Sequence, residues 1–217
     1  DAVRTQQHPE GGEIAAEVDH FEDLTGGPDE TVFDGGSKED DLSSWSDSGS
    51  ASSSGNADIN NVWIFDRVYD VDGDLYVFVA WDRVSDEGSV QWSLELHQLP
   101  NPTDTHGVSV PDRSEGDVRV SMVNQGNGEF SVETIETWDA DGLSWVEPTD
   151  APTIVGTTND STISVPGATR EAERFNEFGF NLSELLGDDD CTFTGFSAFN
   201  LRSQAGLGAA SELKDYA

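Results

Sequence analysis

Cysteine is almost absent from this sequence. The 217 residues include one, Cys191, so no disulfide can form within the chain. One thiol cannot build a thiolate metal site, and the four histidines are scattered, so the sequence also argues against zinc. We expect Cys191 to be a small buried residue rather than a reactive thiol. Stability must then come from a hydrophobic core, from salt and from bound cations of another kind.

Long apolar runs are absent too. The longest candidate, residues 75–81, has the length of a strand and is far shorter than the roughly 18 residues of a membrane-spanning helix. The sequence therefore predicts no membrane insertion. The chain begins at Asp1 rather than Met, which favours an exported protein whose signal peptide has been removed. We expect an extracellular location, either secreted or at the cell surface.

Basic residues are scarce. Ten Lys and Arg oppose 44 Asp and Glu, giving a net charge of −34, and only Lys38 and Lys214 are lysines. Such a field disfavours nucleic acid and anionic membranes as partners. Because self-repulsion destabilises a compact state, cations must screen or bind the carboxylates. High salt and abundant divalent metal both meet this need, and they can coexist. The Asp-rich, Lys-poor composition resembles that of secreted proteins of halophilic archaea.

Recognisable catalytic motifs are missing as well. The sequence contains no nucleophile elbow, phosphate loop, dinucleotide fingerprint or zinc-protease helix. Among 44 acids some pair will lie at glycosidase separation by chance, so proximity of two carboxylates is weak support for hydrolysis. We expect that the protein is not an enzyme and that it acts by binding or assembly.

What the sequence does contain is a series of short β-like segments. From residue 59 onwards, β-branched and aromatic residues form strand-sized segments separated by Gly, Asn and Asp. One helical turn, capped by Asn181 and ended by Gly187, interrupts them. The expected strands cover residues 61–69, 75–81, 90–97, 118–123, 130–138, 144–146, 161–165, 174–180, 192–202 and 211–216. This pattern predicts an all-β fold, a two-sheet antiparallel sandwich of jelly-roll type with one short helical turn.

Residues 1–30 differ from the rest of the chain. They are polar, interrupted by glycines, and hold too few apolar residues to stay ordered alone. We therefore divide the chain into an extended N-terminal arm, residues 1–30, and a sandwich domain, residues 31–217. The arm either packs along its own domain or adds a strand to a neighbouring copy. In the second case the assembly residues would come from Ile14 to Val18 or from Thr31, Val32 and Phe33.

Calcium is the cation that the sequence favours, because it takes six to eight oxygen ligands and this chain supplies carboxylates in short loops. The first cluster, residues 34–41, has two glycines beside its acids and is the preferred site. The second, residues 70–74, looks like half of an EF-hand loop without the closing glutamate, so a solvated turn is the competing interpretation. The third, residues 82–87, could join the first in space. The predicted ligands are Asp34, Glu39, Asp40, Asp41, Asp70, Asp72, Asp74 and Asp82.

Carbohydrate binding is the main alternative, because sandwiches of this kind commonly bind sugars through aromatic faces and six tryptophans are available. We expect the strand-borne tryptophans to be core residues and those near loops or turns to be exposed platforms, namely Trp45, Trp138 and Trp145. Two asparagines match the N-glycosylation pattern, Asn159 and Asn181, and the first is the better candidate.

An ordered set of short motifs adds a family resemblance. The motifs are DGGSKEDDLSSW at 34–45, DINN at 58–61, GDLYVF at 73–78, WDR at 81–83, FNLSEL at 180–185, CTF at 191–193 and ELKD at 212–215. Together they resemble an N-terminal domain of secreted surface proteins of Gram-positive actinobacteria and some archaea, often followed by prealbumin-like stalk repeats. The likeness covers about residues 30–217, and Gln204 stands where the family usually has Ser.

The resemblance implies a surface location and a β fold, and it brings no activity. Together with the composition, it leads us to expect an extracellular structural or surface protein that is stabilised by cations and associates with other copies of itself. A filament built by N-terminal strand addition is one form that such association can take. The alternative is a calcium-dependent lectin-like or adhesin module with glycan partners.

Overall fold

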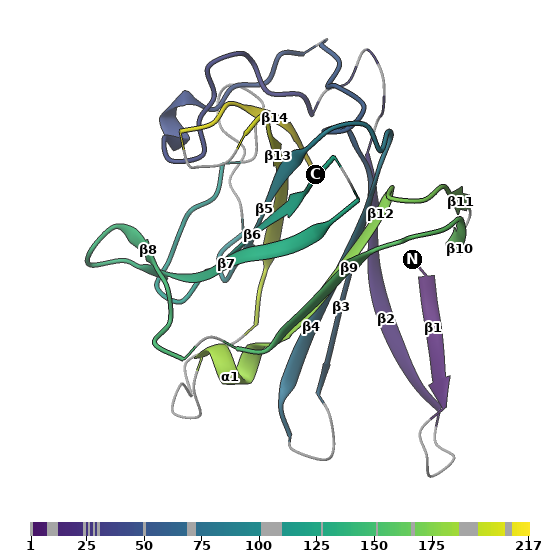
Figure 1. Ribbon diagram of the computed structural model, residues 1–217. Coiled ribbons are helices and arrows are strands. Elements are labelled where there is room, and N and C mark those ends of the chain that lie inside the picture. Colours follow the sequence, from purple (N-terminus) through teal and green to yellow (C-terminus); the bar gives the residue numbers. More distant parts are fainter. Residues whose placement is uncertain are drawn as a thin grey trace.

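The computed structural model describes residues 2–7, 13–23, 25, 27, 29, 31–49, 51–68, 73–100, 110–126, 128–150, 152–165, 168–186, 195–206 and 210–217, with the backbone alone for 2–7 and 13–17. Two antiparallel six-stranded sheets face each other across a hydrophobic core (Figure 1). The all-β, two-sheet sandwich expected from the sequence is confirmed. No helix in the described ranges has the length and apolarity needed to cross a membrane.

The first sheet carries the N-terminal segment at one edge. Its strand order is β1 (Ala2–Gln7), β2 (Glu13–Glu22), β3 (Ile59–Val68), β4 (Leu75–Arg83), β12 (Phe175–Asn181) and β9 (Ile154–Thr158). The second sheet has the order β14 (Leu213–Tyr216), β13 (Ala198–Gln204), β5 (Val90–His97), β6 (Val118–Asn124), β7 (Phe130–Asp139) and β8 (Ser144–Val146). A small separate ribbon pairs β10 (Ile163–Val165) with β11 (Ala168–Arg170).

The core follows from the alternation of apolar residues that identified the strands. Inward-facing side chains of β4 meet those of β5 and β6, and Trp81 packs edge-to-face on Trp92 with ring centroids 5.6 Å apart. Both tryptophans are fully buried. Full burial of a Val, Leu, Ile, Phe or Met side chain contributes roughly 1.5–3 kcal/mol, and many such residues fill the space between the sheets, so this core supplies the main stabilisation.

The two ends of the sandwich are covered differently. Residues 31–49, which include η1 (Leu42–Ser44), lie with β14 over one end, where Phe33, Trp45, Leu213 and Tyr216 form a second buried cluster (Figure 1). The helical turn α1 (Leu182–Leu186) lies at the opposite end. As expected, Asn181 caps it: the Glu184 N–H donates to Asn181 Oδ1 at 3.0 Å.

The N-terminal segment forms a β-hairpin on its own domain. Strand β1 pairs with β2 over six residues, and β2 pairs with β3 of the same chain over only four, Asp19 to Glu22. The hairpin therefore occupies the outer edge of the first sheet, visible beside β3 in Figure 1. The sequence analysis did not anticipate these two strands, nor β9 and β11.

Candidate metal site

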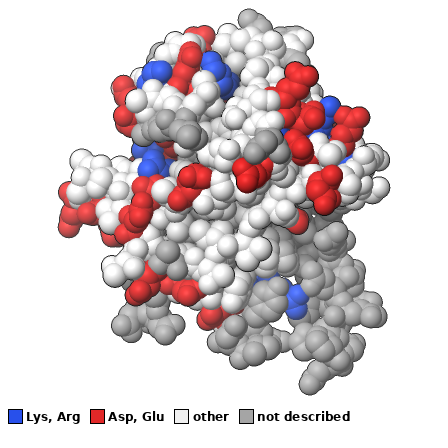
Figure 2. All heavy atoms as spheres, in the orientation of Figure 1, with Lys and Arg blue, Asp and Glu red and all other residues white. Residues whose placement is uncertain are grey.

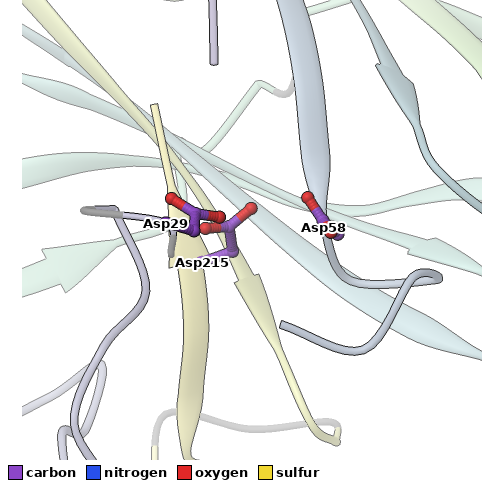
Figure 3. Close-up of side chains that lie close together, drawn as sticks. All are labelled: Asp29, Asp58 and Asp215. Atoms are coloured by element: carbon purple, nitrogen blue, oxygen red, sulfur yellow. The ribbon is translucent and has the colours of Figure 1, made fainter. Parts of the chain in front are cut away.

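Three aspartates converge near the end of the sandwich covered by residues 31–49. Asp29 lies between the hairpin and the buried Val32-Phe33 step, Asp58 directly precedes β3, and Asp215 lies in β14. One carboxylate oxygen from each lies within 4.8 Å of the other two (Figure 3). The three side chains are at most 2 % exposed. Among the described residues this is the one group of three or more potential ligands close enough to share an ion.

Backbone groups hold two of these carboxylates in place. Asp29 Oδ1 accepts hydrogen bonds from the Thr31 N–H at 2.9 Å and the Thr31 hydroxyl at 2.5 Å. Asp215 Oδ2 accepts from the Ile59 N–H at 2.6 Å. The other oxygens, Asp29 Oδ2 and Asp215 Oδ1, have no hydrogen-bond partner in the described chain, and neither carboxylate pairs with a base there. Each residue thus has one anchored oxygen and one available to a ligand.

The electrostatics of the group are unfavourable without a cation. Burial, above all, raises the pKa of Asp215 to about 9, and the charges of Asp23, Asp29 and Asp58 act in the same direction, against the hydrogen bond from Ile59. Burial and neighbouring carboxylates, Asp47 first among them, also raise the pKa of Tyr216. A positive ion at the triad would offset the cost of burying these charges and reduce the repulsion among the neighbouring carboxylates.

The ligand set selects the kind of ion. Oxygen donors without histidine or cysteine suit hard cations. Calcium binds oxygen at 2.3–2.6 Å, so two of its ligands lie up to about 5 Å apart, and the three oxygens of the triad lie within 4.8 Å of one another. Magnesium usually keeps several water ligands and binds through one or two carboxylates, so a set of three buried carboxylates suits calcium better.

The site also ties together segments that are distant in sequence. The Thr31 hydroxyl lies 2.9 Å from Asp23 Oδ1 as well as near Asp29, and its single hydrogen can serve only one of them. Asp23 in turn donates its N–H to the Asn60 carbonyl, and Thr31 accepts from the Tyr216 N–H. An ion at the triad would therefore link the base of the N-terminal hairpin to β3 and to the C-terminal strand.

The first predicted calcium cluster is not assembled as a site. Asp34 and Asp40 are exposed, and Asp41 caps η1 by accepting from the Ser43 N–H at 3.1 Å and the Ser43 hydroxyl at 2.6 Å. Glu39 points the other way and is buried, 2 % exposed. The local density of acids therefore reflects a capped turn and one inward-facing glutamate.

Glu39 belongs to a buried ion-pair network instead. The Arg202 guanidinium donates from Nε to Glu39 Oε2 at 3.0 Å and from Nη2 to Glu39 Oε1 at 2.6 Å. Arg202 Nη2 also reaches Glu95 Oε1 at 2.6 Å, and Arg113 binds the same Glu95 through two hydrogen bonds. Burial alone would raise the pKa of Glu95, but Arg202 and Arg113 hold it down at about 2. The network fastens residues 34–46 to the second sheet.

The other predicted ligands that the structure describes, Asp74 and Asp82, bind different partners and do not share a site. Asp74 accepts from Asn181 Nδ2 at 2.6 Å, and buried Asp82 is bonded by Arg170 and by Asn61 Nδ2, the latter at 3.1 Å. Asp70 and Asp72 lie outside the described residues.

The predicted sugar platforms divide into two groups. Trp45 is 1 % exposed, with its Nε1–H donated to the Lys38 carbonyl and Arg202 over its ring, so its faces are not open to a sugar. Trp138 and Trp145 are half-buried and pack edge-to-face with centroids 5.2 Å apart. The guanidinium carbon of Arg113 lies 5.3 Å from the ring centroid of Trp138 and 5.1 Å from that of Trp145.

Both predicted glycosylation asparagines have structural roles. Asn159 Nδ2 donates to the Ser161 and Glu171 carbonyls, and its Oδ1 accepts from the Phe175 N–H. Asn181 is buried and holds the α1 cap. Their amides thus contribute to local structure.

Asp29, Asp58 and Asp215 were not among the ligands predicted from the sequence. The available signal was position in the strand: Asp215 follows Leu213 at the inward-facing period of β14, where a charged residue is unusual.

Comparison of the chain with protein-family models, with curated proteins and with solved structures found no match.

Proposed function

We propose that this chain is an extracellular structural protein whose sandwich is stabilised by a bound divalent cation, calcium in the first place. The observation that carries the proposal is the buried triad of Asp29, Asp58 and Asp215, with two carboxylate oxygens left without a hydrogen bond among the described residues. Taking carboxylates out of water is costly unless a counter-charge replaces the lost hydration. Calcium supplies that charge and accepts oxygen ligands of this spacing.

The overall charge supports the same role. Acidic side chains spread over the visible face of the molecule, with few basic ones among them (Figure 2). Salt screens surface charges of this kind, but it reaches buried carboxylates much less. A site-bound ion is therefore the means by which the three aspartates of the triad are neutralised, whereas arginines neutralise Glu39 and Glu95 and a saline exterior suffices for the surface.

Thermal unfolding at fixed high sodium chloride tests the cation site. At calcium one hundred times above its dissociation constant, binding stabilises the native state by about 2.7 kcal/mol, or about 5–10 °C in a domain of this size. We expect the melting temperature of the wild type to be higher by this amount in calcium than in chelator, and we expect Asp29→Asn to lose the difference. Asp40→Asn, which removes the same charge from an exposed position, should keep the response. An equal response in both variants would refute the site.

We further propose that copies of the chain associate through the N-terminal hairpin. Of the two predicted donor segments, residues 31–33 are already occupied, because Val32 and Phe33 are buried and bridge to Asp215 and Asp47. The segment from Ile14 to Val18 lies in β2 and pairs with β1, and it lies outside the four-residue ladder to β3. Among the described strands, β1 has β2 as its one neighbour in the sheet, and we propose that its outer edge receives a strand from another copy.

Sedimentation velocity in calcium tests this association. Successive residues of a strand point their N–H groups to opposite sides, so of Arg4→Pro and Thr5→Pro one removes a donor from the outer edge and the other a donor facing β2. We expect large species from the wild type and smaller ones from the outer-edge variant. Undiminished assembly after deletion of residues 1–22 would exclude the hairpin as the contact.

Carbohydrate binding is a second candidate function, supported by the paired rings of Trp138 and Trp145 at the β7–β8 edge. A glycan array with the wild type and Trp145→Ala tests it. Binding that the substitution abolishes would support a lectin-like role, and absence of binding in calcium would exclude it for the glycans presented.

A further inference from the structure

Arg83 is a buried arginine whose terminal nitrogens lack any acceptor in the described chain. It is 1 % exposed, and neither Nη1 nor Nη2 has a hydrogen-bond partner there. Within the described residues its one side-chain hydrogen bond runs from Nε to the Glu173 carbonyl, at 3.0 Å. In a chain with 44 acids and 10 bases, a buried guanidinium without a carboxylate partner is unexpected.

A second arginine lies directly opposite. The Arg83 N–H donates to the Arg174 carbonyl at 2.9 Å, which continues the β4–β12 register by one pair and places both side chains on the same face of the sheet. Arg174 Nε is also buried without an acceptor, while its Nη2 lies 2.7 Å from Glu171 and 3.4 Å from Asp86. Like charges directly opposed across strands repel each other unless something lies between them.

The same face continues inward with more unpaired donors. Two residues along each strand, Trp81 and Asn176 form the next cross-strand pair on this face, and both are fully buried. Trp81 Nε1 and Asn176 Nδ2 have no acceptor among the described residues, although Asn176 Oδ1 accepts from Asn124 at 2.8 Å. Donors thus outnumber acceptors along two successive pairs of this face.

The backbone conformation and the charges around Arg83 support the interpretation that its side chain is held in position to bind a ligand. Glu173 adopts a left-handed conformation with φ 64°, which costs a non-glycine residue roughly 1–3 kcal/mol, and it thereby aims its carbonyl at Arg83 Nε. Asn159 fastens this turn by accepting the Glu173 N–H at 2.7 Å. Burial lowers the pKa of Arg83, with Asp86 and Glu173 opposing this effect and Arg174 reinforcing it.

We propose that Arg83 and Arg174 form a binding site for a small inorganic anion, with chloride as its natural occupant in a saline environment. A halide accepts several N–H donors at once. It would neutralise the Arg83 guanidinium and accept from the buried Arg174 Nε, while Arg174 keeps its pairs with Glu171 and Asp86. The site is separate from the aspartate triad and does not depend on the cation proposal.

Bromide soaked into crystals of the full chain gives a direct test. We expect an anomalous peak within hydrogen-bond reach of Arg83 Nη1 or Nη2. A water molecule in that place, or bromide only at surface positions, would overturn the proposal.

Unfolding at constant sodium and calcium, with chloride exchanged for gluconate, gives a solution test. A tenfold excess of chloride over its dissociation constant stabilises the folded state by about 1.4 kcal/mol, or about 3–6 °C. Wild type should show this difference and Arg174→Gln, at a partly exposed position that leaves the core intact, should lose most of it. Arg119→Gln, which removes an arginine paired with Glu136, is the control and should respond like wild type. Equal responses in all three proteins would contradict the proposal.

Discussion

Replacement of Asp215 by asparagine should change stability in opposite directions with and without calcium. In the cation-free protein the pKa of Asp215 is about 9, against an ordinary value of 3.8. Between these values the folded state binds a proton that the unfolded state has lost, so the contribution of Asp215 to stability is greatest below about pH 4 and falls as pH rises towards 9. At about 1.4 kcal/mol per pH unit, the loss reaches about 4 kcal/mol at pH 7.

Asparagine carries no charge and its side-chain oxygen can still accept the Ile59 N–H. In chelator at pH 7, Asp215→Asn should therefore be more stable than wild type, by up to about 4 kcal/mol, and its stability should depend less on pH. In calcium the order should reverse, because wild type gains binding energy and the variant has lost a charged ligand.

Urea denaturation at pH 5, 7 and 8.5, in chelator and in calcium, measures both effects. Asp40→Asn changes an exposed residue that is not part of the triad, so its free energy of unfolding should stay within about 0.5 kcal/mol of the wild-type value under all conditions. If Asp215→Asn is the less stable protein in chelator, or if wild-type stability does not fall between pH 5 and 8.5 there, the buried repulsion inferred at the triad is wrong.

Three further changes test the architecture around the sites. Glu39→Gln leaves Arg202 without its carboxylate and should cost about 3–5 kcal/mol in urea denaturation, whereas a change below 1 kcal/mol would mean that the network is dispensable. The pKa of Glu95 is lowered to about 2, so its contribution to the free energy of unfolding is present above the ordinary value of 4.5 and is lost as pH falls towards 2. Acid titration should therefore remove about 3 kcal/mol of stability. Stability that stays unchanged over that range would contradict the pairing of Glu95 with the arginines. Trp45→Ala should cost about 3–5 kcal/mol by the same assay, since it empties the second cluster, and a neutral result would show that this end is loosely packed.

The strands that the sequence predicted well are those with one face in the core. β3, β4 and β5 alternate clearly because one sheet packs on the other, and their bounds match the expected segments closely. The small strands β9 and β11 carry little such signal, as Val155 shows at 72 % exposure. The hairpin β1–β2 is too polar to show the apolar alternation that predicts a strand, and it is held in the sheet by the pairing of β2 with β3.

The candidate site was harder to predict for a geometric reason. Glu39 lies among acids in sequence, but its partner Arg202 is 163 residues away, and only the fold shows that the two meet. Asp29, Asp58 and Asp215 show the converse, since none lies in a dense acidic cluster and the crossing of three distant segments brings them together. Local spacing identifies calcium loops built from one segment, whereas this triad is built from tertiary structure.

The most direct measurement is a crystal structure of the chain grown with calcium, with anomalous data collected where calcium scatters and sodium does not. The account predicts a calcium peak bound by oxygens of Asp29, Asp58 and Asp215. A triad holding only water, with calcium instead beside Asp34, Asp40 and Asp41 or nowhere in the molecule, would contradict it.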